Sequence, residues 1–140
     1  MPLEPHDFLA RRWQLARVIE DSLTASTTRF AGQASVTETG AHWTYAETGH
    51  LYLASGQSLV AERSYLWQPS GQGVDISFPD GRAFHRMDLS GGGDHHWCDP
   101  DSYDVTYSFA HWPAWRAVWR VKGPRKDYVM TTDYAYITED

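Results

Sequence analysis

The chain has 140 residues, of which 41% are hydrophobic and 21% are charged, so the composition excludes a disordered protein and fits one globular domain over residues 1–140. The formal net charge is −6 and the basic residues are scattered, which argues against a nucleic-acid partner because nucleic-acid binders concentrate basic charge on one face. No apolar run approaches the ~20 residues of a membrane helix, and the N-terminal residues lack the pattern of a secretory signal. The single cysteine, Cys98, cannot form an internal disulfide. We therefore expect a cytoplasmic protein without membrane contact, either a monomer or a homodimer.

Alternating apolar and polar residues recur along most of the chain, in short segments separated by turn-forming residues. This period of two is typical of half-buried β-strands. Aromatic residues make up 14% of the sequence, and they suit pleated surfaces and cavities where one end of the ring needs a polar partner. The alternating segments lie at residues 13–20, 29–37, 43–53, 59–67, 74–78, 83–89, 94–109, 115–122 and 127–138, and residues 94–109 have the character of a hairpin.

Consecutive hairpins of this kind, with no long helical pattern, predict an all-β protein. Closing such a meander removes its exposed edges, so we expect a closed antiparallel up-and-down β-barrel of about 8–10 strands in one domain. A β-sandwich is the alternative. In the segment 83–89, His85 and Met87 are predicted to face inward and Phe84 outward, whereas the last strand has Tyr and Thr on both faces and its facing stays open.

Several polar side chains lie on the same side of their strand as the apolar residues, the side that is expected to face inward. Burying a charge is costly unless it is paired or contacts water or a ligand. Two inward arginines and one inward glutamate leave one surplus positive charge, which predicts a pocket for a small polar or anionic molecule such as a carboxylate. The predicted ligand-binding residues are Arg17, Tyr45, Arg63, Tyr65, Tyr107 and Trp119.

Each of these residues also has a purely structural interpretation. Arg17 could close one end of the barrel by stacking on an aromatic ring, while Glu47 pairs with Arg63. His85 could be a core histidine bonded to a carbonyl group. The turn at 125–127 could be solvated and contain a local salt bridge rather than contact a ligand.

The segment 94–107 concentrates the groups that could hold a metal ion. His96 and Cys98 lie two residues apart on one strand, and His85 could supply a third ligand for zinc. However, there is no second cysteine and no HxxxH or CxxC spacing, so we expect no metal and no cofactor. Cys98 beside His95 and His96 is also a poor match to a nucleophile with its base, because neighbouring strand residues do not point at one another.

An enzyme in the same cavity is the alternative to a binding protein. It would be a cofactor-independent lyase, isomerase or hydratase, with His85 or His96 as base and Glu47 or a tyrosine as acid. A second alternative is a scaffold whose exposed aromatic residues bind another protein.

The sequence contains five distinctive blocks, which are FLARRWQLARVIED, ERSYLW, FPDGRAFHRMDL, HHWCDPDSYDVTY and WRVKGPRKDYVMTTDY. Together they resemble a bacterial and plant family of uncharacterised domains that is assigned to the lipocalin-like, or calycin-like, barrels. The resemblance covers nearly the whole chain, and its most specific parts are the patterns HxCxxDxY at residues 96–103 and GPRKDY at 123–128. It implies a closed antiparallel barrel with an internal pocket and implies no reaction. The surroundings of Phe8 and Trp13 are similar to the barrel-closing tryptophan of lipocalins.

Overall fold

The computed structural model describes residues 2–138, which form ten strands and one 3-10 helix. The strands are joined in chain order by tight turns, as the alternating segments predicted. No helix among the described residues is long and apolar enough to cross a membrane. The elements are η1 (Pro5–Phe8), β1 (Arg12–Asp21), β2 (Ser26–Thr39), β3 (His42–Tyr52), β4 (Ser58–Ser70), β5 (Gly73–Ser77), β6 (Ala83–Asp88), β7 (Gly92–Cys98), β8 (Asp101–Ser108), β9 (Trp115–Lys122) and β10 (Asp127–Tyr136).

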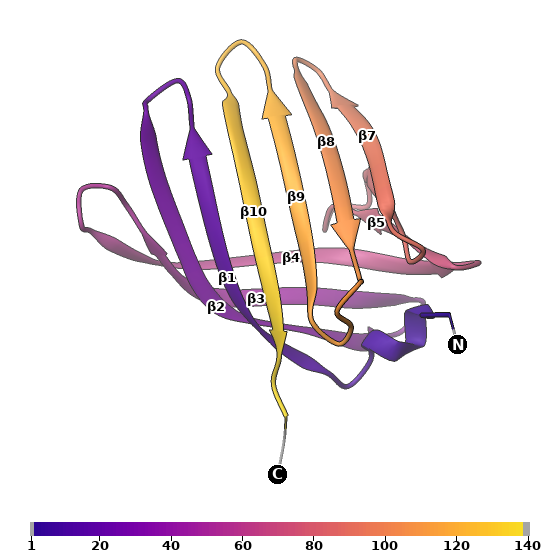
Figure 1. Ribbon diagram of the computed structural model, residues 1–140. Helices are drawn as coiled ribbons and strands as arrows, with labels where there is room; N and C mark the ends of the chain where they lie inside the picture. The colour runs from indigo at the N-terminus through magenta and orange to yellow at the C-terminus, as the bar shows by residue number, and fades with distance from the viewer. Residues whose placement is uncertain (1, 139–140) are drawn as a thin grey trace.

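All ten strands belong to one antiparallel sheet in the order β6-β5-β4-β3-β2-β1-β10-β9-β8-β7. The sheet curls so that its two edge strands, β6 and β7, approach each other (Figure 1). These two edges share no ladder, but the backbone N–H of Arg86 donates to the Asp94 carboxylate at 2.7 Å. The predicted all-β up-and-down barrel is confirmed, with the correction that it is nearly closed rather than closed; a β-sandwich is not formed.

One end of the barrel is sealed by aromatic rings. The helix η1 lies at this end, opposite the turns that join β1 to β2, β7 to β8 and β9 to β10 (Figure 1). Its Phe8 is fully buried and packs edge-on against Trp67 and Trp112, with ring centroids 5.4 and 4.7 Å apart. Trp13 is also fully buried, and its indole N–H donates to the carbonyl of Pro113 at 2.9 Å. Among the described residues, no helix lies across the opposite end, which we call the open end of the barrel (Figure 1).

The predicted alternation is confirmed for β1, β2 and β9, in which every second residue is buried over most of the strand and Arg17 is a charged residue among the buried positions. It is wrong for Phe84, which is buried next to the equally buried His85. The β5–β6 ladder is irregular between Ile76 and Ser77, and such a bulge lets two consecutive residues face the same side. In β10, the unassigned strand, the buried residues are Met130, Thr132 and Tyr134.

The backbones of β2 and β3 come unusually close where Gly32 pairs with Gly49. A Cβ added at Gly49 would lie 2.2 Å from the carbonyl oxygen of Ala31, and one at Gly32 would lie 2.3 Å from that of Thr48. Only glycine fits such an approach, which allows these long strands to bend around the interior.

Candidate functional site

A cavity of about 30 Å³ lies in the barrel interior. This is roughly the volume that one water molecule occupies in the liquid, so the interior is mostly filled by side chains. The wall includes every predicted ligand-binding residue, together with Glu47 and His85, whereas His96 is not part of it. The lining residues are Arg17, Tyr45, Glu47, Arg63, Tyr65, Trp67, Ile76, His85, Tyr107, Trp115, Ala117, Trp119, Thr132 and Tyr134.

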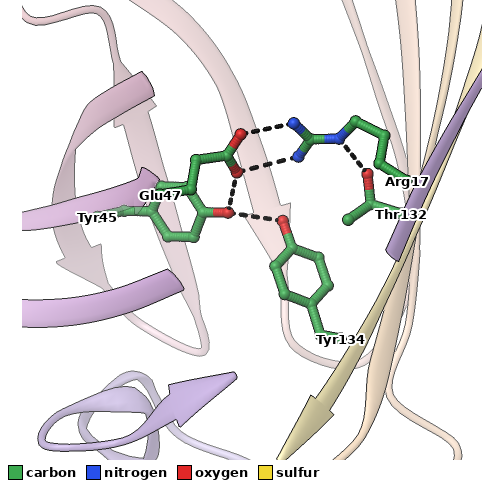
Figure 2. A network of polar contacts seen from close by, with 5 residues as sticks. All are labelled: Arg17, Tyr45, Glu47, Thr132 and Tyr134. Carbon is green, nitrogen blue, oxygen red and sulfur yellow. Dashed lines mark hydrogen bonds and ion pairs between the residues drawn. The ribbon is translucent and has the colours of Figure 1, made fainter. Parts of the chain in front are cut away.

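A buried polar network spans the cavity from β1 and β10 to β3 (Figure 2). The guanidinium of Arg17 donates to both carboxylate oxygens of Glu47, at 2.5 and 3.0 Å. Its Nε donates to the hydroxyl of Thr132 at 2.7 Å. Tyr45 donates its hydroxyl to Glu47 at 2.5 Å and lies 2.8 Å from the hydroxyl of Tyr134. Every member of this network therefore has a partner.

The network fixes the charges of its members. Burial opposes ionisation of Glu47, but the hydrogen bonds and charge of Arg17 outweigh burial and hold the pKa of the carboxyl below its ordinary value. Burial raises the pKa of Tyr45 and of Tyr134, so both phenols are neutral at neutral pH. The predicted role of Glu47 as a proton donor does not fit this geometry, because the carboxylate is deprotonated and accepts three hydrogen bonds from Arg17 and Tyr45. The predicted structural pairing of Glu47 with Arg63 is wrong as well, since Arg17 takes that place.

Arg63 is the second arginine of the cavity wall and is in a different situation. It is exposed, and its guanidinium lies over the ring of Trp119, 5.5 Å from the ring centroid. Arg63 stands opposite Glu47 in the β3–β4 ladder, yet it forms no ion pair within residues 2–138. Tyr65, two residues further along β4, is partly buried and also lines the cavity.

His85 and Tyr107 form a hydrogen-bonded pair on the opposite wall, with His85 Nε2 2.7 Å from the Tyr107 hydroxyl. Burial lowers the pKa of His85 to about 4, so the imidazole is neutral at neutral pH. Burial also raises the pKa of Tyr107 well above 10. The pair therefore consists of two neutral groups that together have one proton-accepting nitrogen.

The other predicted histidine, His96, packs against Phe84 with ring centroids 5.3 Å apart and against Tyr103 at 6.3 Å. Cys98 is a half-buried free thiol. No group of three metal-binding side chains is gathered anywhere in the described part of the chain. His85, His96 and Cys98 are thus not brought together as a zinc site, and His96 is not placed to act in the same cavity as His85.

The two most specific sequence patterns meet at the open end of the barrel. Lys126, from the turn between β9 and β10, lies 3.0 Å from the Asp101 carboxylate and donates to the Tyr103 hydroxyl at 3.2 Å. Its neighbour Asp127 pairs with Arg120 at 2.7 Å. The turn at 125–127 therefore forms salt bridges to neighbouring strands, with Lys126 reaching a residue far away in sequence.

Sequence reasoning missed Thr132 and Tyr134, which complete the buried network from β10. Tyrosine and threonine occur on both faces of this strand, so its own pattern is ambiguous. The pairing of β1 with β10 resolves the ambiguity, because Arg17 stands opposite Thr132 and Leu15 opposite Tyr134. The sequence analysis also did not assign Trp67 and Trp115 to the cavity wall.

The barrel is similar to that of a solved structure, the S-type phycobiliprotein lyase CPES from Guillardia theta. The TM-score is 0.58 over 92% of this chain and 87% of that chain, at 8% sequence identity, which shows a common fold. A comparison with curated proteins gave no match. The model of a family of unknown function, DUF6314, matches residues 9–136, nearly the whole chain, in agreement with the predicted membership of an uncharacterised family. The chain therefore belongs to the family of unknown function DUF6314.

Proposed function

We propose that this protein binds a small anionic molecule, with a carboxylate as the preferred group, at the open end of the barrel. The observation that carries the proposal is the position of Arg63, whose guanidinium lies over Trp119 in the cavity wall with no ion pair among residues 2–138.

The charges of the interior support an anion at this place. Arg17 and Arg63 contribute two positive charges and Glu47 contributes one negative charge, so one positive charge remains. Arg17 and Glu47 neutralise each other, and the surplus therefore sits on Arg63 alone. A carboxylate would accept two parallel hydrogen bonds from a guanidinium, a geometry that lysine cannot reproduce.

The size of the cavity limits how much of such a ligand could lie inside the barrel. About 30 Å³ holds no more than a single small group, whereas pockets for drug-sized molecules measure roughly 300–1,000 Å³. The ligand would therefore lie across the open end, against the partly exposed rings of Tyr65 and Trp119. Aromatic surfaces of this kind favour flat or apolar bodies. The similar fold of a phycobiliprotein lyase supports a barrel that receives a small molecule, without indicating which one.

A catalytic function in the same cavity is a second candidate, favoured by the hydrogen-bonded pair of His85 and Tyr107. In the tautomer with Nδ1 unprotonated, this neutral imidazole could accept a proton from a bound substrate, and the Tyr107 hydroxyl could return one. This would suit a cofactor-independent lyase, isomerase or hydratase. Transfer of solvent deuterium into a bound carboxylate, lost in His85→Gln, would distinguish this function from binding alone.

Thermal melts with a chemically varied panel of aromatic and aliphatic carboxylates test the binding proposal. We expect at least one carboxylate to raise the melting temperature of the wild type and not that of Arg63→Met. The matched control is Arg29→Met, because Arg29 is an exposed arginine on the outer face of β2. A panel that shifts neither the wild type nor the control, or shifts Arg63→Met equally, would contradict the proposal.

A further inference from the structure

Two buried nitrogen atoms in the cavity wall have no hydrogen-bond partner among the described residues. They are Nε1 of Trp115 and Nδ1 of His85, whose side chains are 5% and 7% exposed. Both side chains line the same cavity of about 30 Å³. Because buried polar groups are almost always paired with protein, ligand or ordered water, one acceptor in this cavity would satisfy both atoms.

The hydrogen bond between His85 and Tyr107 determines which kind of partner fits. The Tyr107 hydroxyl has one partner within residues 2–138, His85 Nε2 at 2.7 Å. If the hydroxyl donates to Nε2, then Nδ1 of the neutral ring carries the proton and is a donor. The opposite arrangement would leave two groups without partners, the hydroxyl proton of Tyr107 and the lone pair of Nδ1. Since an unpaired buried group is costly, the first arrangement is favoured.

Most of the other polar groups of the cavity wall already have partners. Arg17 donates to Glu47 and to Thr132, and the hydroxyls of Tyr45 and Tyr134 form a pair. The cavity therefore offers two uncharged N–H donors, from an indole and an imidazole, and no strong acceptor of its own that is still open. Two neutral donors suit an uncharged acceptor oxygen, and the volume suits a single one.

We propose that Trp115 and His85 donate hydrogen bonds to one carbonyl oxygen of the ligand, while Arg63 binds the ligand's anionic group. This inference rests on the proposed function for the anionic end only. It narrows the ligand to a carboxylate that also bears an uncharged carbonyl, such as an oxo acid or an acylated amino acid.

The tautomer of His85 tests the donor assignment on the unmodified protein. Long-range 1H–15N spectra of the labelled wild type should show the His85 ring protonated at Nδ1. A ring protonated at Nε2 would overturn the inference, because Nδ1 would then be an acceptor. This measurement does not depend on any ligand or on the stability of a variant.

Acetamide, a small neutral carbonyl probe, tests the inner site apart from Arg63. We expect acetamide to shift the indole N–H signal that is missing from Trp115→Phe, in the wild type and equally in Arg63→Met. The exposed Trp97, substituted in Trp97→Phe, provides the control signal and should not respond. A Trp115 signal that acetamide leaves unchanged, or moves no more than that of Trp97, would overturn the inference.

A matched series of acids tests the ligand class. Oxo acids of increasing carbonyl-to-carboxylate spacing are compared with the same acids lacking the carbonyl. We expect one spacing to bind more tightly than its match by at least the roughly 2- to 10-fold effect of one neutral hydrogen bond, and Trp115→Phe to reduce this preference by removing one of the two donors. Carboxylates that bind through Arg63 without any preference for a carbonyl would overturn this inference and leave the proposed function standing. A response to acetamide without any Arg63-dependent carboxylate binding would overturn the proposed function and leave the assignment of the two N–H donors standing.

Discussion

The guanidinium of Arg17 and the carboxylate of Glu47 form a buried, bidentate ion pair across the barrel interior, with N–O distances of 2.5 and 3.0 Å. Removing one partner of such a pair leaves an uncompensated buried charge. We therefore expect Arg17→Met or Glu47→Gln each to lower the free energy of unfolding by about 3–5 kcal/mol. Urea denaturation at neutral pH measures this loss.

The double variant Arg17→Met/Glu47→Leu should be more stable than either single variant, because no charge is left unpaired. The control is Arg116→Met, which breaks the exposed pair between Arg116 and Asp133 and should cost far less. Single variants that unfold at the same urea concentration as the wild type would show that the pair is not buried.

The second prediction concerns pH. Burial lowers the pKa of His85 from 6.5 to about 4. Between these two pH values the unfolded chain binds a proton at His85 and the folded chain does not. Stability contributed by neutral His85 is present above pH 6.5 and is lost as the pH falls toward 4. We expect the free energy of unfolding to fall by about 2 kcal/mol between pH 7.5 and 5, measured by urea denaturation.

Two variants identify the group responsible. His85→Gln should remove most of this pH dependence, while His50→Gln, at an exposed position, should retain it. Glu47 acts in the same direction but at lower pH, because its pKa is below 4.5 in the folded protein and its stabilising effect is lost only as the carboxyl becomes protonated. An unchanged slope in His85→Gln would assign the effect to another residue.

The third prediction concerns the close approach of β2 and β3. A methyl group at Gly49 would lie 2.2 Å from the Ala31 carbonyl oxygen, a backbone atom that cannot rotate away. Gly49→Ala should therefore destabilise the protein by about 1–3 kcal/mol, as overpacking does. Thermal unfolding measures the change. The neighbouring exposed residue provides the control, since Thr48→Ala adds no atoms at this contact; equal melting temperatures for the two variants would contradict the structure here.

Much of the barrel follows from alternation in the sequence. The strand containing Trp115 has apolar residues at every second position, and so does the first strand apart from Arg17, so their facing could be predicted from one residue to the next. The facing of Phe84 could not, because a bulge depends on the ladder that two strands form together. The facing of the last strand could not either, since threonine and tyrosine tolerate both a buried and an exposed side.

The sequence predicts which residues belong to the site better than it predicts which of them contact one another. Arg17, Glu47 and Arg63 were all predicted to line one cavity, because each lies on the same side of its strand as apolar neighbours, and all three are in the cavity wall. Which arginine pairs with Glu47 could not be predicted, because it depends on distances across the barrel and the alternation along one strand contains no such information. The small volume of the cavity likewise results from how the aromatic rings pack against one another.

The claim that Arg63 holds an anionic ligand is tested most directly by calorimetric titration of the most effective carboxylate from the thermal panel. We predict that Arg63→Lys weakens binding by about 1.5–3 kcal/mol, roughly 10- to 150-fold in Kd, because one charge-assisted hydrogen bond is lost. Arg63→Met should weaken binding at least as much, and Arg29→Met should leave the Kd unchanged. A Kd for Arg63→Met equal to that of the wild type would contradict the account, since the ligand would then bind without the only arginine that we assign to it.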